Sequence, residues 1–212
     1  MRNTAIGVTA IAVLAGLAPA GPAPAALAPS AGSQPVKSAS VHGEARISYI
    51  ESIDHDIRFT IHAEQKPFTR PLPPTAPQGL STDAVGTLKI SHTLPGGATG
   101  WAEAQVDCLV TSHRTATMTA IVTKSNVEEV GARLGISVQQ GAKGESDRLG
   151  FSWGVVNVDP GNVDEDGQLV RPQAGTCMAP APFTTVIKGG FKVVHAEIRK
   201  SPTQPGAAIR RG

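Results

Sequence analysis

An acidic segment from Asp159 to Leu169, with the sequence DPGNVDEDGQL, carries the densest group of carboxylates in the chain. From Asn162 onward it matches the opening of a calcium-binding loop, N-x-D-x-D-G-x-L, in which oxygen ligands alternate and a glycine allows a sharp turn. Asp159 lies just outside this loop and would add one more oxygen. The candidate ligands are Asp159, Asn162, Asp164 and Asp166.

The remainder of the loop departs from the calcium-binding pattern. Its twelfth position is Gln173, which cannot supply the bidentate carboxylate that completes an EF-hand, and no helical pattern flanks the loop. Asp, Asn and Gly also form ordinary hydrated turns, because their side chains bond local backbone and they tolerate positive φ. A hydrated turn is therefore the favoured interpretation. Calcium, with an affinity of about 10⁻⁴ to 10⁻³ M, is the alternative, and no other cofactor is expected.

A second short motif, GFSWG from Gly150 to Gly154, fits the G-x-S-x-G string of serine hydrolases. That chemistry needs a tight turn from a strand into a helix, which presents the serine hydroxyl to the substrate. The sequence VVNVDPG follows here and continues a strand-like pattern. We therefore interpret Ser152 as an ordinary strand serine and predict no catalytic residue.

The six histidines are each isolated in the sequence, without the H-x-H or H-E-x-x-H spacing of a metal site. Three of them, His62, His92 and His195, lie near the ends of predicted strands, where folding could gather them at one rim of a sheet. Solvated surface histidines are the favoured interpretation.

Cys108 and Cys177 are the two cysteines of the chain. An exported protein meets conditions that allow such a pair to form a disulfide. The bridge would close a loop of about seventy residues, for which the chain-entropy model gives at most about 4 kcal/mol of stabilisation. We predict a structural disulfide.

Trp101 differs from the other aromatic residues because it follows a glycine-rich turn, in GGATGWAE. An exposed tryptophan at such a place would suggest contact with a carbohydrate or a protein partner. The remaining aromatic residues alternate with polar ones, which is typical of core positions. Trp101 is therefore the candidate binding residue.

The elements that must position these residues are short segments with alternating apolar and polar side chains. In DIRFTIHA, for example, Ile57, Phe59 and Ile61 share one face and Arg58 and Thr60 the other. Nine such segments, separated by turn residues, predict an all-β domain of about eight or nine short strands. Its architecture would be a single antiparallel β-barrel or a β-sandwich. The proline-rich stretch 64–83 interrupts the pattern and predicts a long surface loop.

The two ends of the chain differ from this middle part. Residues 1–25 have the basic start, apolar run and small-residue end of a signal peptide, which predicts export and a secreted protein. Residues 26–40 form an Ala/Pro/Ser-rich leader and 201–212 a similar tail, both expected to be disordered, around a β domain at 41–200.

Charge and hydropathy exclude two classes of partner. Cleavage after residue 25 would remove Arg2 and lower the formal net charge from +2 to +1, which gives little attraction for nucleic acid. No segment after the signal peptide is apolar enough to span a membrane. We therefore expect neither a nucleic-acid partner nor a stable membrane span after signal cleavage.

The strand segments also resemble a group of small exported proteins of high-GC Gram-positive bacteria, some of them labelled repetin. The resemblance covers residues 41–194 and rests on the order of VHGEARISY, DIRFTIHA, GTLKISH, QVDCLVTSHRTATMTAIVT, GARLGISVQQGAKGESDRLGFSWG and CMAPAPFTTVIKGGFKV. It implies a compact exported β domain and no established activity. Ala120 stands where the pattern usually has Gly, and Gln139 and Gln140 stand where it has an acidic residue, which leaves Asp147 as the acidic residue of that stretch.

These observations favour a non-catalytic function outside the cell, in binding or structural interaction with an extracellular protein, a glycan or a small molecule. A small-ligand carrier, with a barrel closed around an apolar cavity, is the alternative. A hydrolase is less favoured, because no catalytic group accompanies Ser152. A packed interior with an exposed Trp101 would favour the binding domain, and an apolar cavity would favour the carrier.

Overall fold

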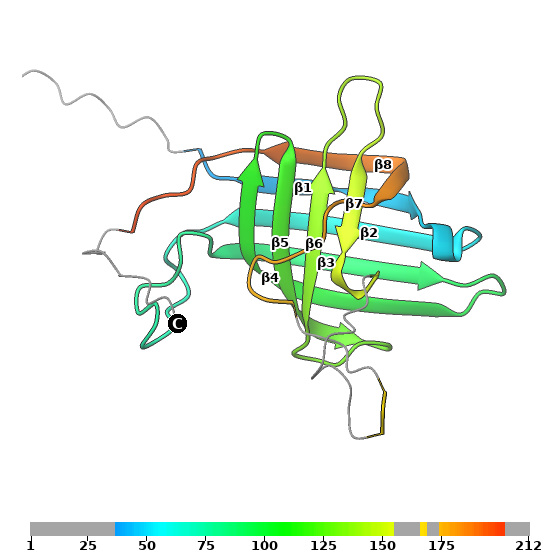
Figure 1. Ribbon diagram of the computed structural model, residues 1–212, viewed down its shortest axis with the longest axis horizontal. Coiled ribbons are helices and arrows are strands. Elements are labelled where there is room, and N and C mark those ends of the chain that lie inside the picture. Colours follow the sequence, from blue (N-terminus) through cyan, green and yellow to red (C-terminus); the bar gives the residue numbers. More distant parts are fainter. Residues whose placement is uncertain (1–36, 155–165, 169–173, 202–212) are drawn as a thin grey trace, which may run out of the picture. The chain divides into compact units, whose positions relative to one another are not determined.

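The computed structural model describes residues 37–154, 166–168 and 174–201, and these contain eight strands (Figure 1). The strands are β1 (Ser40–Ser48), β2 (Asp56–Gln65), β3 (Ala84–Thr93), β4 (Thr99–Ser112), β5 (Thr115–Ser125), β6 (Arg133–Gln139), β7 (Arg148–Phe151) and β8 (Thr184–Val194). Two short 3₁₀ helices, η1 (Ile50–Ser52) and η2 (Ser152–Gly154), follow β1 and β7. Each strand pairs antiparallel with the next, and β8 pairs with β1, so that the sheet closes into one barrel. The all-β prediction is confirmed, as a barrel.

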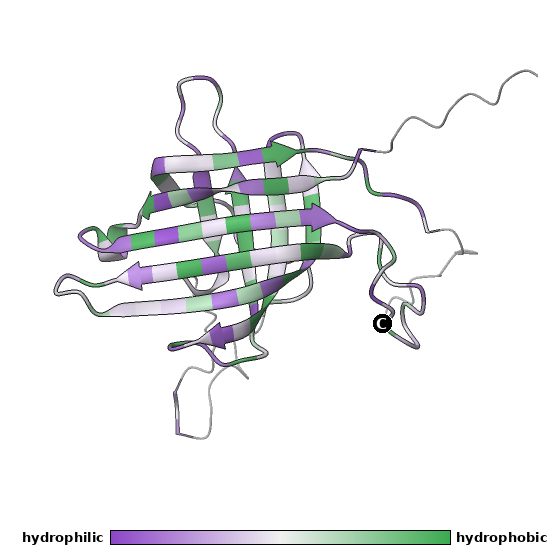
Figure 2. Cartoon of the chain, turned by 180° about the vertical axis from the view of Figure 1, so that it is seen from behind, coloured by the Kyte–Doolittle hydropathy of each residue, from purple (hydrophilic) through white to green (hydrophobic). Residues whose placement is uncertain are grey.

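Alternating hydropathy builds the barrel wall (Figure 2). In β2, Ile57, Phe59 and Ile61 are buried while Arg58 is exposed, because successive side chains of a strand point to opposite faces. The same alternation in the other strands fills the interior with large apolar side chains. Those with almost no exposed surface include Phe59, Ile61, Leu88, Leu109, Met118, Ile136 and Leu149. The barrel therefore encloses a packed core.

The prediction of nine strand segments is wrong in one place, because FTTVI and GFKVVHAEI form the single strand β8. The Gly189-Gly190 pair has the composition of a turn, but both glycines pair with β1, opposite Ala45 and Glu44. The register shifts next to them, at Ile187, because Arg46 is opposite Lys188 and Ile47 is opposite Val186. Gly189 has φ +79°, and a Cβ there would overlap the carbonyl oxygen of Glu44. Glycine thus allows β8 to continue where a side chain would force it away from β1.

The strand predicted for DRLGFSWGVV is also shorter than expected. It ends at Phe151, and η2 follows directly. Strand β7 joins β8 through two residue pairs, Arg148 with Thr185 and Leu149 with Thr184. This seam closes the barrel, and it is much shorter than the pairing of β8 with β1.

Residues 174–183 form a strap across the outer face of β5, β6 and β7 (Figure 1). The strap is fixed by the predicted disulfide between Cys108 and Cys177, whose Cα atoms lie 5.3 Å apart. The backbone N–H of Cys177 donates to the Thr119 hydroxyl at 3.1 Å, and the Ser137 hydroxyl donates to the Pro180 carbonyl at 2.5 Å. The disulfide prediction is confirmed, and the bridge attaches a second layer to the barrel.

Glycines in β6 and β7 allow this close approach. A Cβ on Gly135 would lie 2.2 Å from the Met178 carbonyl oxygen, and one on Gly150 would lie 2.4 Å from the Ala181 carbonyl oxygen. The strap therefore covers the outer face of these strands. This explains why β6 is buried along consecutive positions instead of every second one.

The predicted proline-rich loop connects β2 to β3 and is organised by a buried carboxylate. Asp83 has 2 % exposure, and its Oδ2 accepts hydrogen bonds from the backbone N–H groups of Thr69, Arg70 and Leu80 at 3.0, 2.8 and 3.0 Å. Bonds to a charged acceptor are among the stronger ones in proteins. A single side chain thus holds three points of a long loop against the barrel.

Several predictions fall outside the described residues. These are the signal peptide 1–25, the leader up to residue 36, the tail after residue 201, and three of the four proposed calcium ligands, Asp159, Asn162 and Asp164. The fourth, Asp166, is exposed, and Gly167 beside it has the positive φ of a turn, +75°. Within the described part of the chain, no helix has the length and apolar character needed to cross a membrane.

Candidate functional site

One end of the barrel carries a half-open apolar pocket, here called the mouth pocket, with a volume of about 300 Å³. It lies where β3 ends and β4 and β6 begin, next to the β5–β6 loop and η2. Its lining residues are Ile90, His92, Leu94, Gly100, Trp101, Ala102, Val127, Glu128, Leu134 and Trp153. An apolar hollow with a few polar groups is the usual form of a small-molecule site.

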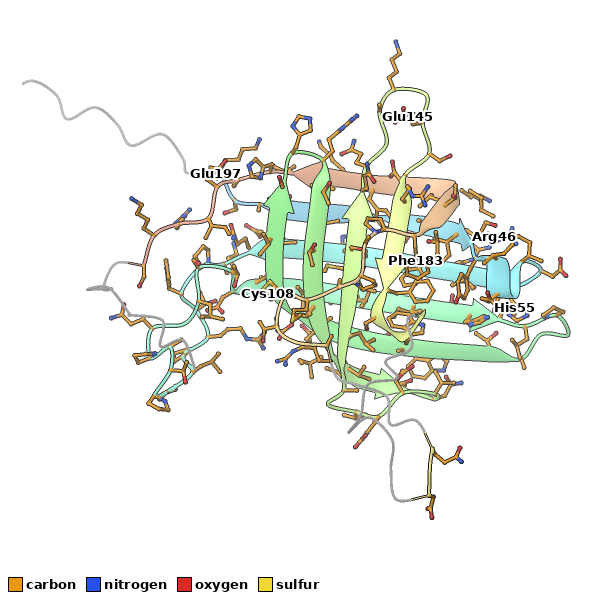
Figure 3. The ribbon with its side chains drawn as sticks, viewed as in Figure 1. Arg46, His55, Cys108, Glu145, Phe183 and Glu197 are labelled. Atoms are coloured by element: carbon orange, nitrogen blue, oxygen red, sulfur yellow. A yellow bond between two sulfur atoms is a disulfide. The ribbon has the colours of Figure 1, made fainter. Side chains whose placement is uncertain are left out.

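Aromatic rings pack beneath the mouth pocket. The Trp153 ring from η2 stacks on Phe59 with centroids 6.0 Å apart and tilts against Phe151 at 4.8 Å. Phe151 in turn contacts Tyr49 at 5.4 Å and Phe183 at 5.0 Å (Figure 3). Such contacts between rings add to the stability that their burial provides. Through Trp153, which lines the pocket, these rings connect the mouth pocket to the packed core.

The mouth pocket keeps apolar side chains in contact with solvent. Leu94 is 44 % exposed and Val127 is 63 % exposed, although both line an apolar hollow. Val127 packs over Gly100, where an added Cβ would lie 3.0 Å from its methyl group. Since apolar surface prefers to leave water, these side chains would gain from an apolar occupant of the pocket.

A histidine pair lies at the same end of the barrel. His55 Nδ1 lies 2.6 Å from His92 Nε2, with ring centroids 4.9 Å apart (Figure 3). Burial lowers the pKa of His92 below its ordinary value, and the electrostatic interaction with His55 lowers it further. His92 is therefore neutral at neutral pH, and it gives the mouth pocket a polar group that does not carry a charge.

Trp101 is exposed, as the sequence predicts, but it lies within β4 instead of at a loop tip. Its side chain is 39 % exposed and borders the mouth pocket. Its backbone is held by the β5–β6 loop, because its N–H donates to Asn126 Oδ1 at 2.7 Å and its carbonyl accepts from the Ser125 hydroxyl at 2.8 Å. The role of Trp101 in binding stays a prediction that rests on this position.

The remaining candidate residues have structural contacts. Ser152 begins η2, and its hydroxyl accepts a hydrogen bond from the backbone N–H of Gly135 at 3.0 Å. Asp147 accepts from the N–H groups of Gly141 at 2.7 Å and Phe191 at 2.6 Å, which joins the β6–β7 loop to β8. These contacts assign Ser152 and Asp147 to the positioning of backbone.

The predicted rim histidines do not form a single group. His62 lies beside His42, with centroids 5.7 Å apart, whereas His195 contacts Thr111 at 3.1 Å. His92 contacts His55 instead of either of them. Among the residues that the structure describes, no group of three or more His, Cys, Asp or Glu side chains is placed to hold a metal ion.

Of the residues that line the mouth pocket, sequence patterns singled out Trp101 and His92 and missed the rest, Trp153 among them. Trp153 has the alternation of a core residue, and the turn into η2 that brings it to the mouth has no clear signal. The contact between His55 and His92 crosses the β2–β3 pair, where Ile57 is opposite His92. His55 precedes β2, so its side chain reaches His92 from outside the strand pairing, and strand patterns alone would not find it.

Comparisons with models of protein families, with curated proteins and with solved structures find no match to this chain. The resemblance to small exported β proteins therefore stays a prediction from the sequence.

Proposed function

We propose that this chain is an exported, non-catalytic binding domain that holds an apolar group of its ligand in the mouth pocket. The observation that carries the proposal is the pocket itself, because exposed Leu94 and Val127 and two tryptophans surround one hollow at the barrel end. Export is supported by the signal-like start of the chain, and the disulfide is compatible with it.

A small-ligand carrier is the second candidate, because the sheet closes into a barrel and the hollow at its mouth is apolar. Phe59, Phe151 and Trp153 fill the space below the pocket. A carried molecule would therefore lie at the mouth and leave part of its surface in solvent. A pocket of this size suits a small ring system or one apolar side chain of a partner better than a long acyl chain.

Titration with N-phenyl-1-naphthylamine, an uncharged apolar fluorophore, tests the proposal on the full chain. We expect saturable binding at one site, a rise in probe fluorescence, and a change in the emission of Trp101 and Trp153, which both line the pocket. Replacing a pocket residue by a charged one removes apolar contact, so Leu94→Asp and Val127→Asp should each weaken binding about tenfold.

Ile187→Asp is the matched control, because Ile187 is 54 % exposed and lies on β8 outside the mouth pocket. It should leave probe binding unchanged. Absence of saturable binding, or equal loss of binding in all three variants, would contradict the proposal.

A further inference from the structure

Strand register places a row of cationic side chains and a tryptophan across five strands of the outer barrel surface. Lys188 of β8 is opposite Arg46 of β1, and Arg46 is opposite Arg58 of β2. Arg58 is opposite Ser91 of β3, which is opposite Trp101 of β4. With strands about 4.8 Å apart, the row spans roughly 19 Å. We call this row, with the surface hollows along it, the transverse groove.

Two hollows lie along the transverse groove and meet at Arg58 and Thr60. The first, of about 190 Å³, is lined at its polar side by Glu44, Arg46, Arg58, Thr60 and Lys188. The second, of about 340 Å³, is lined by Arg58, Thr60, Lys89, Ile90, Ser91, Trp101, Ala102 and Glu103. Because they share two residues, the two hollows lie next to each other across the strands.

Positive charge is in excess at the β8–β1–β2 end of the groove. Asp56 is the carboxylate between Arg46 and Arg58, and its hydrogen bonds come from Arg58 Nε at 3.0 Å. Arg46 forms an ion pair with Asp56 through its buried Nε, 3.0 Å from Oδ1, while the Arg46 side chain as a whole is 38 % exposed. Lys188 has no ion-pair partner within the described ranges. This end of the groove therefore still has cationic donors for an anionic ligand.

The charge becomes balanced toward the other end of the groove, where the aromatic ring lies. Lys89 pairs with Glu103 at 3.2 Å, and beyond them Trp101 presents exposed ring surface on a backbone fixed by Ser125 and Asn126. Binding against a ring that is already held in place costs little conformational entropy of the protein. The groove thus joins an anion-binding end to an apolar platform.

We propose that the transverse groove binds an acidic oligosaccharide, a chain of sugar rings that carry carboxylates. The apolar C–H face of one ring would pack on Trp101, as amphipathic aromatic side chains do at wet interfaces. Carboxylates further along would meet Arg46 and Lys188, where a guanidinium gives paired charge-assisted hydrogen bonds. Hydroxyl groups between them would face Thr60 and the Lys89–Glu103 pair.

The same surface disfavours nucleic acid as the occupant. Proteins that bind single-stranded nucleic acid stack successive bases on several aromatic side chains, whereas Trp101 is the one exposed aromatic side chain among the described residues that line the groove. A sugar chain can pack one ring on Trp101 and place its hydroxyl groups along the polar remainder of the path, which fits this mixed surface. The groove and the mouth pocket adjoin at Ile90, Trp101 and Ala102, which line both, and the cationic residues of the groove do not line the mouth pocket.

Binding of pentagalacturonate to the full chain, measured by calorimetry at low salt, tests the inference. We expect saturable binding, and little or no binding of the methyl ester of the same oligosaccharide, which lacks the carboxylates. Arg46→Gln and Lys188→Gln should each weaken binding about tenfold, because each removes a charge-assisted contact. Arg46→Lys should weaken it less, since it keeps the charge and loses the planar fork.

Lys143→Gln is the matched control, because Lys143 is exposed on the β6–β7 loop away from the groove. Its binding should equal that of the unchanged protein, and melting curves of all variants should show that they fold. Trp101→Ala should lower affinity for both pentagalacturonate and the apolar fluorophore, whereas Arg46→Gln should affect the oligosaccharide alone. No binding of pentagalacturonate, equal binding of its methyl ester, or tighter binding of single-stranded DNA would each overturn the inference.

Discussion

His55 and His92 share one short contact at the mouth of the barrel, with 2.6 Å between Nδ1 of the first and Nε2 of the second. At that distance one ring must donate a proton and the other accept it, so the two imidazoles cannot both be charged without breaking the contact. Protonation of both rings in acid would therefore break this contact at the mouth of the barrel.

The pH dependence of stability follows from His92. Burial and the nearby His55 lower the pKa of folded His92, so the folded protein binds a proton less readily than the unfolded chain. The stability that neutral His92 contributes is therefore present above the unfolded pKa of about 6.5 and is lost as the pH falls through the lower folded pKa. Melting temperatures measured from pH 8 to pH 5 should fall across this window.

Replacement of His92 should reduce this loss of stability in acid. We expect His92→Gln to have a flatter melting profile between pH 7 and pH 5, while His113→Asn, in the exposed β4–β5 turn, keeps the original slope. Asn is chosen for the control because His113 has φ +50°, which asparagine tolerates. An unchanged slope in His92→Gln would show that other groups cause the acid sensitivity.

Removal of the disulfide should loosen the strap more than it loosens the barrel. The bridge joins residues 69 positions apart, so a Cys108→Ala/Cys177→Ala variant should lose up to about 4 kcal/mol of unfolding free energy. Its strap, residues 174–183, should also be cut sooner by an added protease than in the oxidised protein. Urea unfolding and timed proteolysis measure the two effects, and equal curves for both proteins would contradict the structural role of the bridge.

Asp83 should contribute strongly to the stability of the folded protein through the proline-rich loop. Its Oδ2 accepts three backbone hydrogen bonds, and Asp83→Ala would leave those N–H groups without their acceptor. The expected loss is about 3 kcal/mol in urea unfolding. Glu51→Ala, which removes an exposed carboxylate of η1, should change stability little. A small effect of Asp83→Ala would mean that water replaces the carboxylate.

The two interpretations of the acidic segment predict different responses to calcium. A hydrated turn at Asp159–Asp166 should give the same melting curve in millimolar calcium and in chelator. A calcium site with millimolar affinity would raise the melting temperature as calcium increases, since ligands that bind the folded state stabilise it. We expect identical curves, and a rise that disappears in an Asp164→Asn variant would reverse this interpretation.

Alternation along the strands made much of the barrel predictable. Residues such as Ile57, Phe59 and Ile61 must share a face in any strand, so the pattern identified the strands without knowledge of their partners. It could not separate a barrel from a sandwich, because closure depends on the short β7–β8 seam, which pairs residues far apart in the chain. Gly189 and Gly190 have the composition of a turn, and only their pairing with β1 shows that β8 continues through them.

The candidate site was less predictable than the fold. Trp101 is a candidate because a glycine-rich turn precedes it. Cys108 and Cys177 are predicted to pair because they are the two cysteines of a chain that is expected to be exported. The mouth pocket depends on how η2 turns Trp153 over the barrel end and on how Val127 packs over Gly100. Both arrangements depend on tertiary packing, which has no period in the sequence.

The most direct test of binding at the mouth is to locate a bound apolar molecule by nuclear Overhauser contacts to labelled methyl groups. With N-phenyl-1-naphthylamine bound, the proposed function predicts contacts from the probe to the methyl groups of Leu94, Val127 and Leu134, which line the mouth pocket. Contacts to Leu109 or Met118 in the packed interior, or no contacts with the three mouth residues, would contradict it.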